Sequence, residues 1–216
     1  MTDTLISLFY ATLESVYMLF FSAIFAILIG LPIGLLLFAW HSKTSVSGKL
    51  AYRISDLIIN ILRSVPFAIL ILIVLPLTLF IVGRRTGTTA TIVPLVISAF
   101  PFVARITEQS ISSLDKGIYE AARSMGLSRM QILFKVLLPE ALPNLIQGLT
   151  IMLVTLFGYS AMAGAIGGGG LGNLALRFGY HRRDELALWL AVIVSVLLVQ
   201  CIQASGNYLS AKLNRR

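Results

Sequence analysis

Residues 120–143 read EAARSMGLSRMQILFKVLLPEALP, and they interrupt a chain that is otherwise strongly apolar. The segment carries two acidic and three basic residues, a glycine in its first half and two prolines near its end. Long uncharged stretches lie on both sides of it. A polar segment between such stretches indicates a part of the chain that lies outside the bilayer and has a function of its own.

The composition of the whole chain identifies it as an integral membrane protein. Of its 216 residues, 57% are hydrophobic and 12% are charged, and the mean hydropathy is +0.91. Soluble domains have about 25% charged residues, so this chain lacks the polar surface that a soluble fold requires. We therefore predict an all-α protein whose helices span the bilayer.

The net charge of +8 does not indicate nucleic-acid binding, because the basic residues stand at the ends of apolar runs. Basic residues in such places interact with anionic lipid headgroups and follow the positive-inside rule. The single cysteine, Cys201, excludes an internal disulfide. His41 and His181 are isolated from other ligand residues, so we expect no metal site.

Uncharged windows predict five spans. The windows are residues 15–40, 64–83, 86–104, 141–176 and 186–211. About 20 apolar residues cross a bilayer as a helix, and the end of the fourth window, GAIGGGGLGN (164–173), is too rich in glycine to continue one. We expect one membrane domain, residues 1–216, with spans at about 15–40, 57–83, 86–108, 143–164 and 186–211 and with residues 115–140 outside them.

The first window is too long for a cleaved signal peptide, whose apolar core has about 7–15 residues. It covers 26 residues, from Ser15 to Trp40, and acidic residues, Asp3 and Glu14, precede it where a signal peptide has basic ones. We expect it to be a true span.

Five spans place the two ends of the chain on opposite sides of the membrane. With the C-terminus in the cytoplasm, eleven Lys and Arg residues fall on the inner side and five on the outer side. The positive-inside rule favours this orientation, although Arg84 and Arg85 stand against it. We predict an outer N-terminus, a cytoplasmic C-terminus and a cytoplasmic position for residues 115–140.

Residues 115–140, which we call the elbow, have the signals of two short helices joined by a tight turn. Asp115 or Ser113 can cap the first helix, and Ser128 can cap the second. Gly126 between them permits a positive φ, which ends a helix. Pro139 is expected to end the second helix, because an interior proline costs about 3 kcal/mol.

The elbow resembles the EAA motif of ABC importer permeases. That motif reads Glu-Ala-Ala, then glycine, then Ile-x-Leu-Pro at this spacing, and only Val136 in place of isoleucine departs from it. The matching residues are Glu120, Ala121, Ala122, Gly126, Val136, Leu138 and Pro139. The resemblance implies that they form a coupling helix, which docks in a groove of a separate ATP-hydrolysing subunit.

Three further stretches are similar to methionine ABC importer permeases of the type I class. They are RSVPF (63–67), FPFVAR (100–105) and GYSAMAGAIGGGGLG (158–172). The resemblance implies the type I permease fold and import of D- and L-methionine across the inner, or cytoplasmic, membrane. It also implies a homodimer without a cofactor of its own, two copies of an ATPase subunit that bind ATP and Mg²⁺, and a periplasmic or lipoprotein methionine-binding protein.

Other function classes fit the sequence less well. The glycine run lacks the Gly-Lys-Ser/Thr ending of a phosphate loop, and no nucleophile–base set indicates an enzyme. Ion-coupled secondary transporters usually carry ionisable residues inside their spans. Here such residues lie at the span edges, where snorkelling explains them: Asp56, Arg63, Arg105 and Glu108. A permease for another amino acid in the ABC class remains the first alternative, and a secondary transporter the second.

Three residues near the end of the fourth span are candidates for the translocation path, namely Tyr159, Ser160 and Met162. Small residues surround Met162, so its side chain would protrude into the axis of a homodimer and close it as a gate. Ordinary helix packing is the competing interpretation, since methionine commonly fills gaps between helices.

Overall fold

The described part of the chain, residues 2–41 and 46–214 of a computed structural model, consists of helices and connecting turns and contains no strand, which confirms the all-α prediction. The long helices are α1 (Thr2–His41), α2 (Val46–Ser64), α3 (Phe67–Val82), α4 (Thr88–Ser112), α7 (Leu138–Gly164) and α9 (Glu185–Leu213). The short segments are α5 (Lys116–Ser124), α6 (Arg129–Ile132), α8 (Gly170–Leu174) and two π-helical segments, η1 (Leu133–Leu137) and η2 (Ala175–Tyr180).

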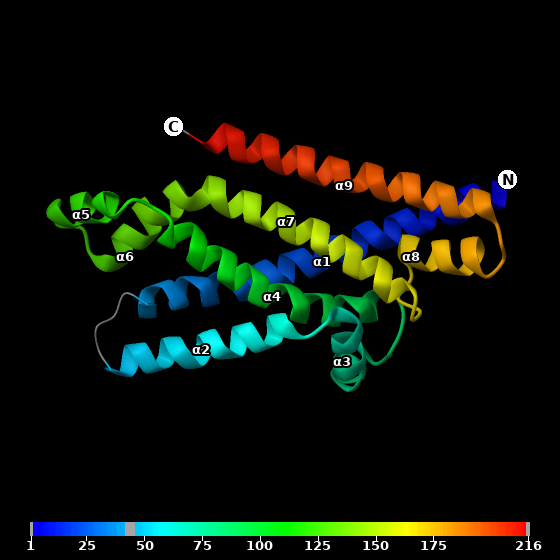
Figure 1. Cartoon of the computed structure of the whole chain (residues 1–216), viewed down its shortest axis with the longest axis horizontal. Coiled ribbons are helices and arrows are strands. Elements are labelled where there is room, and N and C mark those ends of the chain that lie inside the picture. The colour runs from blue at the N-terminus through cyan, green and yellow to red at the C-terminus, as the bar shows by residue number, and fades with distance from the viewer. Residues whose placement is uncertain (1, 42–45, 215–216) are drawn as a thin grey trace.

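Four long helices, α1, α4, α7 and α9, form a bundle along the longest axis of the molecule (Figure 1). Each is long and apolar enough to cross a membrane, α7 together with the short segments before it. The elbow and the end of α9 lie at one end of the bundle, whereas the start of α1 and α8 lie at the other (Figure 1). The chain therefore starts and finishes at opposite ends of the bundle.

The contact between α1 and α4 forms the centre of the bundle. A Cβ atom at Gly30 would lie 2.5 Å from the carbonyl oxygen of Phe100 and 2.6 Å from Cβ of Val103. A Cβ atom at Gly34 would lie 2.4 Å from the carbonyl oxygen of Ala104. The two glycines thus let the backbones of α1 and α4 approach closely, as small residues do between membrane helices.

The second expected span, residues 57–83, is not one continuous helix. Its helices, α2 and α3, meet at an angle of 108°, and the bent pair supplies the fifth span only if it is counted as one. Proline disfavours the helical conformation of the residue before it and offers no N–H. The helix α2 accordingly ends at Ser64, and Val65 before the proline is not helical. Pro66 itself has ψ of 134°, and its carbonyl oxygen starts α3 by accepting the N–H groups of Ile69 and Leu70, both at 2.9 Å.

The second helix of the elbow does not end at Pro139. Instead α6, η1 and α7 run as one helix from Arg129 to Gly164. A proline ring clashes with the carbonyl group four residues earlier, which here belongs to Lys135 in the π-helical segment η1. The chain forms a π turn at this place, so its local geometry differs from that of the α-helix in which the clash arises. The prediction that Pro139 separates the elbow from the fourth span is therefore wrong.

Polar side chains connect α2 to α4. Arg105 forms ion pairs with Asp56 and with Glu108, the latter at 2.7 Å. Arg105 also donates to the side-chain oxygen of Asn60 at 3.1 Å, and Asn60 donates to Asp56 at 3.2 Å. The side chain of Arg105 is only 13% exposed. Asp56, Arg105 and Glu108 therefore belong to a network between two helices. The expectation that these three residues snorkel to the surface is wrong.

We predict that Gly30→Ala destabilises the bundle, whereas Gly158→Ala does not. An added methyl group at Gly30 would overlap with α4, and overpacking of this kind costs about 1–3 kcal/mol. No atom lies within 4 Å of a Cβ atom built at Gly158, and alanine is the better helix former. Thermal unfolding of both variants in detergent would measure the difference. Equal melting temperatures would contradict the close approach of α1 and α4.

Candidate coupling surface and translocation path

The first helix of the elbow, α5, begins at a capped end. Asp115 accepts a hydrogen bond from the backbone N–H of Gly117, at 2.6 Å. Further along α5, Glu120 and Ala121 are exposed, whereas Ala122 is 1% exposed. The three residues that begin the EAA motif therefore divide into one that packs inward and two that face outward.

A left-handed glycine and a capping box form the turn of the elbow. Gly126 has φ of +79°, as expected from its place between the two short helices. The hydroxyl group of Ser128 accepts from the N–H of Gln131, and the side chain of Gln131 accepts from the N–H of Ser128 at 2.8 Å. This reciprocal pair fixes the direction in which the second helix leaves the turn.

An apolar cluster joins the elbow to the spans. Its buried members come from α1, α4 and the elbow with the first turn of α7, and they are Leu35, Ile111, Ala122, Ile132, Leu133, Leu137 and Ala141. Val136 and Leu138 pack partly buried against this cluster, whereas Pro139 is exposed. Because separation would expose these apolar side chains to water, we expect displacement of the elbow to be transmitted to α1 and α4.

The outer side of the elbow carries apolar side chains that the motif did not indicate. Met125 and Met130 are 72% and 64% exposed, and Phe134 is 48% exposed. A groove of about 350 Å³ between the end of α1 and the elbow is bordered by Lys116 and Glu120. Several large exposed apolar side chains on one segment are typical of a protein-binding surface. The spacing of Met130 and Phe134, four residues apart on one helix face, was the signal for it in the sequence.

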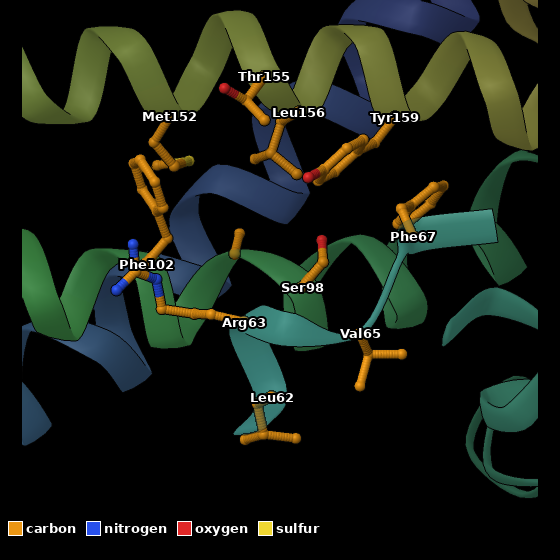
Figure 2. A pocket seen from close by; sticks show the side chains of 11 residues that line it. Leu62, Arg63, Val65, Phe67, Ser98, Phe102, Met152, Thr155, Leu156 and Tyr159 are labelled. Carbon is orange, nitrogen blue, oxygen red and sulfur yellow. The ribbon is translucent and has the colours of Figure 1, made fainter. Parts of the chain in front are cut away.

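The three path candidates have different environments. Tyr159 stacks on Phe67 of α3, with 4.5 Å between ring centroids and 2° between ring planes, and lines a cavity (Figure 2). Ser160 is 2% exposed, and its hydroxyl group donates to the carbonyl oxygen of Phe157 at 2.7 Å. Met162 is 50% exposed. Tyr159 and Met162 are thus accessible from outside the chain, whereas Ser160 packs within it.

The glycine-rich stretch after α7 forms a tight turn into α8. Positive φ angles occur at Gly167, Gly169 and Gly170. Glu14 of α1 accepts from the N–H of Gly170 at 2.6 Å, and Ser15 accepts from the N–H of Leu171 at 2.9 Å. These two N–H groups, which a phosphate loop would offer to a nucleotide, are bonded here to α1. Among the described residues, no group of three or more His, Cys, Asp or Glu could hold a metal ion.

Comparisons with known proteins extend over nearly the whole chain. Residues 26–215 match the family described as "Binding-protein-dependent transport system inner membrane component". The "Probable D-methionine transport system permease protein MetI" of Pasteurella multocida is 50% identical over 206 residues, which are 95% of each chain. The protein of that name from Haemophilus influenzae is 47% identical over 206 residues, 95% of this chain and 97% of its own.

A solved structure of an inward facing conformation of the MetNI methionine ABC transporter is similar to the whole fold. It covers 100% of both chains with a TM-score of 0.95 and 40% sequence identity. Its fold agrees with the type I importer permease fold that the resemblance to methionine ABC importer permeases implied. On this evidence the chain belongs to the family of binding-protein-dependent transport system inner membrane components, and it is a multi-pass membrane permease and not an enzyme.

Proposed function

We propose that this chain is the permease subunit of an ATP-driven importer that carries D- and L-methionine across the inner membrane. The observation that carries the proposal is the match of the chain, elbow included, to proteins named for methionine transport. Four long apolar helices provide the membrane crossing. The exposed Met125, Met130 and Phe134 of the elbow provide a surface for a second protein.

The energy comes from a separate subunit in this proposal. The N–H groups of Gly170 and Leu171 are bonded to α1, so the glycine-rich turn does not offer them to a nucleotide. ATP and Mg²⁺ bind instead to an ATPase subunit. Two copies of this ATPase dock on a homodimer of the chain. A methionine-binding protein delivers the substrate from outside. ATP binding draws the two elbows together and opens the bundle outward, and hydrolysis reverses the change. Such alternating access needs two states that different ligands favour.

Reconstitution tests this function. We expect proteoliposomes that hold the chain, its ATPase and the binding protein to take up methionine only when the ATPase is supplied with ATP. Preferential uptake of another amino acid would support the first alternative, a permease of a different ABC amino-acid importer. Uptake by this chain alone in an ion gradient would support a secondary transporter and reject the proposal.

The coupling function is assigned to the EAA residues of the elbow. Glu120 and Ala121 would contact the ATPase, together with the exposed side chains of the same surface. Gly126 would set the angle between the two elbow helices. Ala122, Val136, Leu138 and Pro139 would hold the elbow against the spans, since the first three pack on the apolar cluster there.

We predict that Glu120→Lys weakens binding of the ATPase by about tenfold or more, because reversal of an interface charge places like charges together. The matched control is Glu185→Lys, the same charge change at the opposite end of the bundle, in the first turn of α9. Co-purification of the ATPase and methionine uptake measure the effect. Full co-purification with Glu120→Lys, or an equal loss with Glu185→Lys, would reject the coupling surface.

The orientation of the chain forms a further part of the proposal. An outer N-terminus and a cytoplasmic C-terminus bring the elbow to the side where ATP is available, and the Lys and Arg distribution supports this orientation. We expect a reporter fused after Arg216 to be active as a cytoplasmic fusion, and one inserted in residues 84–88 to be active as an external fusion. Reporters that are active on the same side would contradict the arrangement.

Met162 is proposed as the gate at the two-fold axis, with Tyr159 and Ser160 beside it. We expect Met162→Cys, in a Cys201→Ala background, to crosslink between the two permeases without nucleotide and to lose the crosslink when ATP is bound. The half-exposed side chain of Met162 supports this expectation. Ser195→Cys, on α9, is the control and should not respond to ATP. Labelling of Met162→Cys only by lipid-soluble reagents would place residue 162 on the outer face and reject the gate.

A further inference from the structure

A cavity of about 160 Å³ lies where α4 and α7 face the break between α2 and α3 (Figure 2). Phe67, Met152 and Leu156 give it an apolar wall, and Arg63, Ser98 and Thr155 give it polar groups. This volume exceeds the space that one water molecule needs by several-fold. The cavity therefore suits a small solute and is too small for a segment of another protein.

Arg63, the last basic residue of α2, is the charged side chain at this cavity. Its guanidinium group lies over the ring of Phe102, 5.4 Å from the ring centroid. Among the described residues no ion pair joins Arg63 to an acid, whereas Arg105 at the same contact between α2 and α4 pairs with two. A guanidinium group presents a fork of N–H donors that fits a carboxylate. Arg63 is therefore free to bind the carboxylate of a ligand.

Two hydroxyl groups at the cavity, those of Ser98 on α4 and Thr155 on α7, can accept hydrogen bonds from a ligand, whereas Arg63 can only donate them. Ser98 donates to the carbonyl oxygen of Leu95 at 2.8 Å, and Thr155 donates to that of Ile151 at 2.9 Å. Each hydroxyl group has a single hydrogen atom, so both can only accept hydrogen bonds from a ligand. Acceptors of this kind suit an ammonium group.

We propose that this cavity is a binding subsite for a zwitterionic amino acid with an apolar side chain. Arg63 binds the α-carboxylate, Ser98 and Thr155 accept from the α-ammonium group, and the side chain of the substrate packs on Met152 and Leu156. The proposal rests on the proposed function and extends it, because it assigns recognition of the amino-acid backbone to the permease itself. One charged contact gives weak binding, which a path that must release its substrate requires.

The stacked rings of Tyr159 and Phe67 connect this subsite to the shape of the bundle. They join α7 to the first residue of α3, directly after the 108° bend. Both rings line the cavity (Figure 2), so a change in the angle between α2 and α3 alters its size. The subsite would thus differ between the two states of the transporter.

The test is protection of a cysteine by substrate. The Ser98→Cys variant in a Cys201→Ala background is alkylated with a maleimide in the assembled permease–ATPase complex, without nucleotide or binding protein. We expect L-methionine at about nine times its Kd to slow alkylation about tenfold. Methioninol, in which a hydroxymethyl group replaces the carboxylate, should give no protection. Arg63→Gln should raise the methionine concentration required on the order of tenfold or more, and Arg63→Lys less.

Two controls separate binding from packing. Alkylation of the exposed native Cys201 on α9 should not respond to methionine. Phe102→Leu removes the ring beneath Arg63 but keeps the cation, so it should preserve protection if the cation binds substrate. Equal loss in Phe102→Leu and Arg63→Gln, equal protection by methioninol, or no protection by methionine would overturn the subsite. ATP-driven methionine uptake without protection rejects the subsite alone, whereas absence of such uptake rejects the proposed function.

Discussion

Backbone groups inside a bilayer have no water to bond with, so a break in a membrane helix must be satisfied by other groups of the protein. The turn after α7 satisfies this constraint through α1, because Glu14 and Ser15 accept the N–H groups of Gly170 and Leu171. The carbonyl oxygen of Gly167 accepts from Gly87 at 2.9 Å, immediately before α4 begins. The glycine-rich turn is thus part of the scaffold at one end of the bundle.

Charged side chains near the spans also need partners within the protein, and two arginines have partners of different kinds. Arg105 has two carboxylate partners and an amide, so its charge holds α2 against α4. Arg63 has an aromatic ring and no acidic partner among the described residues. Both arginines lie at the contact between α2 and α4. Arg105 holds the two helices together, and Arg63 leaves a cation at the cavity. A structural and a substrate-binding arginine can therefore stand on adjacent helices without interfering.

Local signals in the sequence predicted much of this structure. Uncharged windows located α1, α4, α7 and α9, and Ser128 as a cap and Gly126 defined the turn of the elbow. The sequence did not predict the break at Pro66, because a proline can either bend a membrane helix or be accommodated in it. Pro139 is accommodated, because the helix from Arg129 to Gly164 continues through it. The pairing of Asp56 with Arg105 joins residues 49 positions apart, and no local pattern contains that contact.

The continuous helix from Arg129 to Gly164 gives the elbow a direct mechanical connection to the far side of the membrane. Its 36 residues span about 54 Å at about 1.5 Å per residue. One end packs in the apolar cluster beneath the elbow, and the other carries Tyr159, Met162 and the glycine turn bonded to α1. A helix interrupted at Pro139, as the sequence suggested, would absorb a push at the elbow in a hinge. Because the helix continues through Pro139, we expect movement of the elbow to shift the stack of Tyr159 on Phe67 and hence the walls of the cavity.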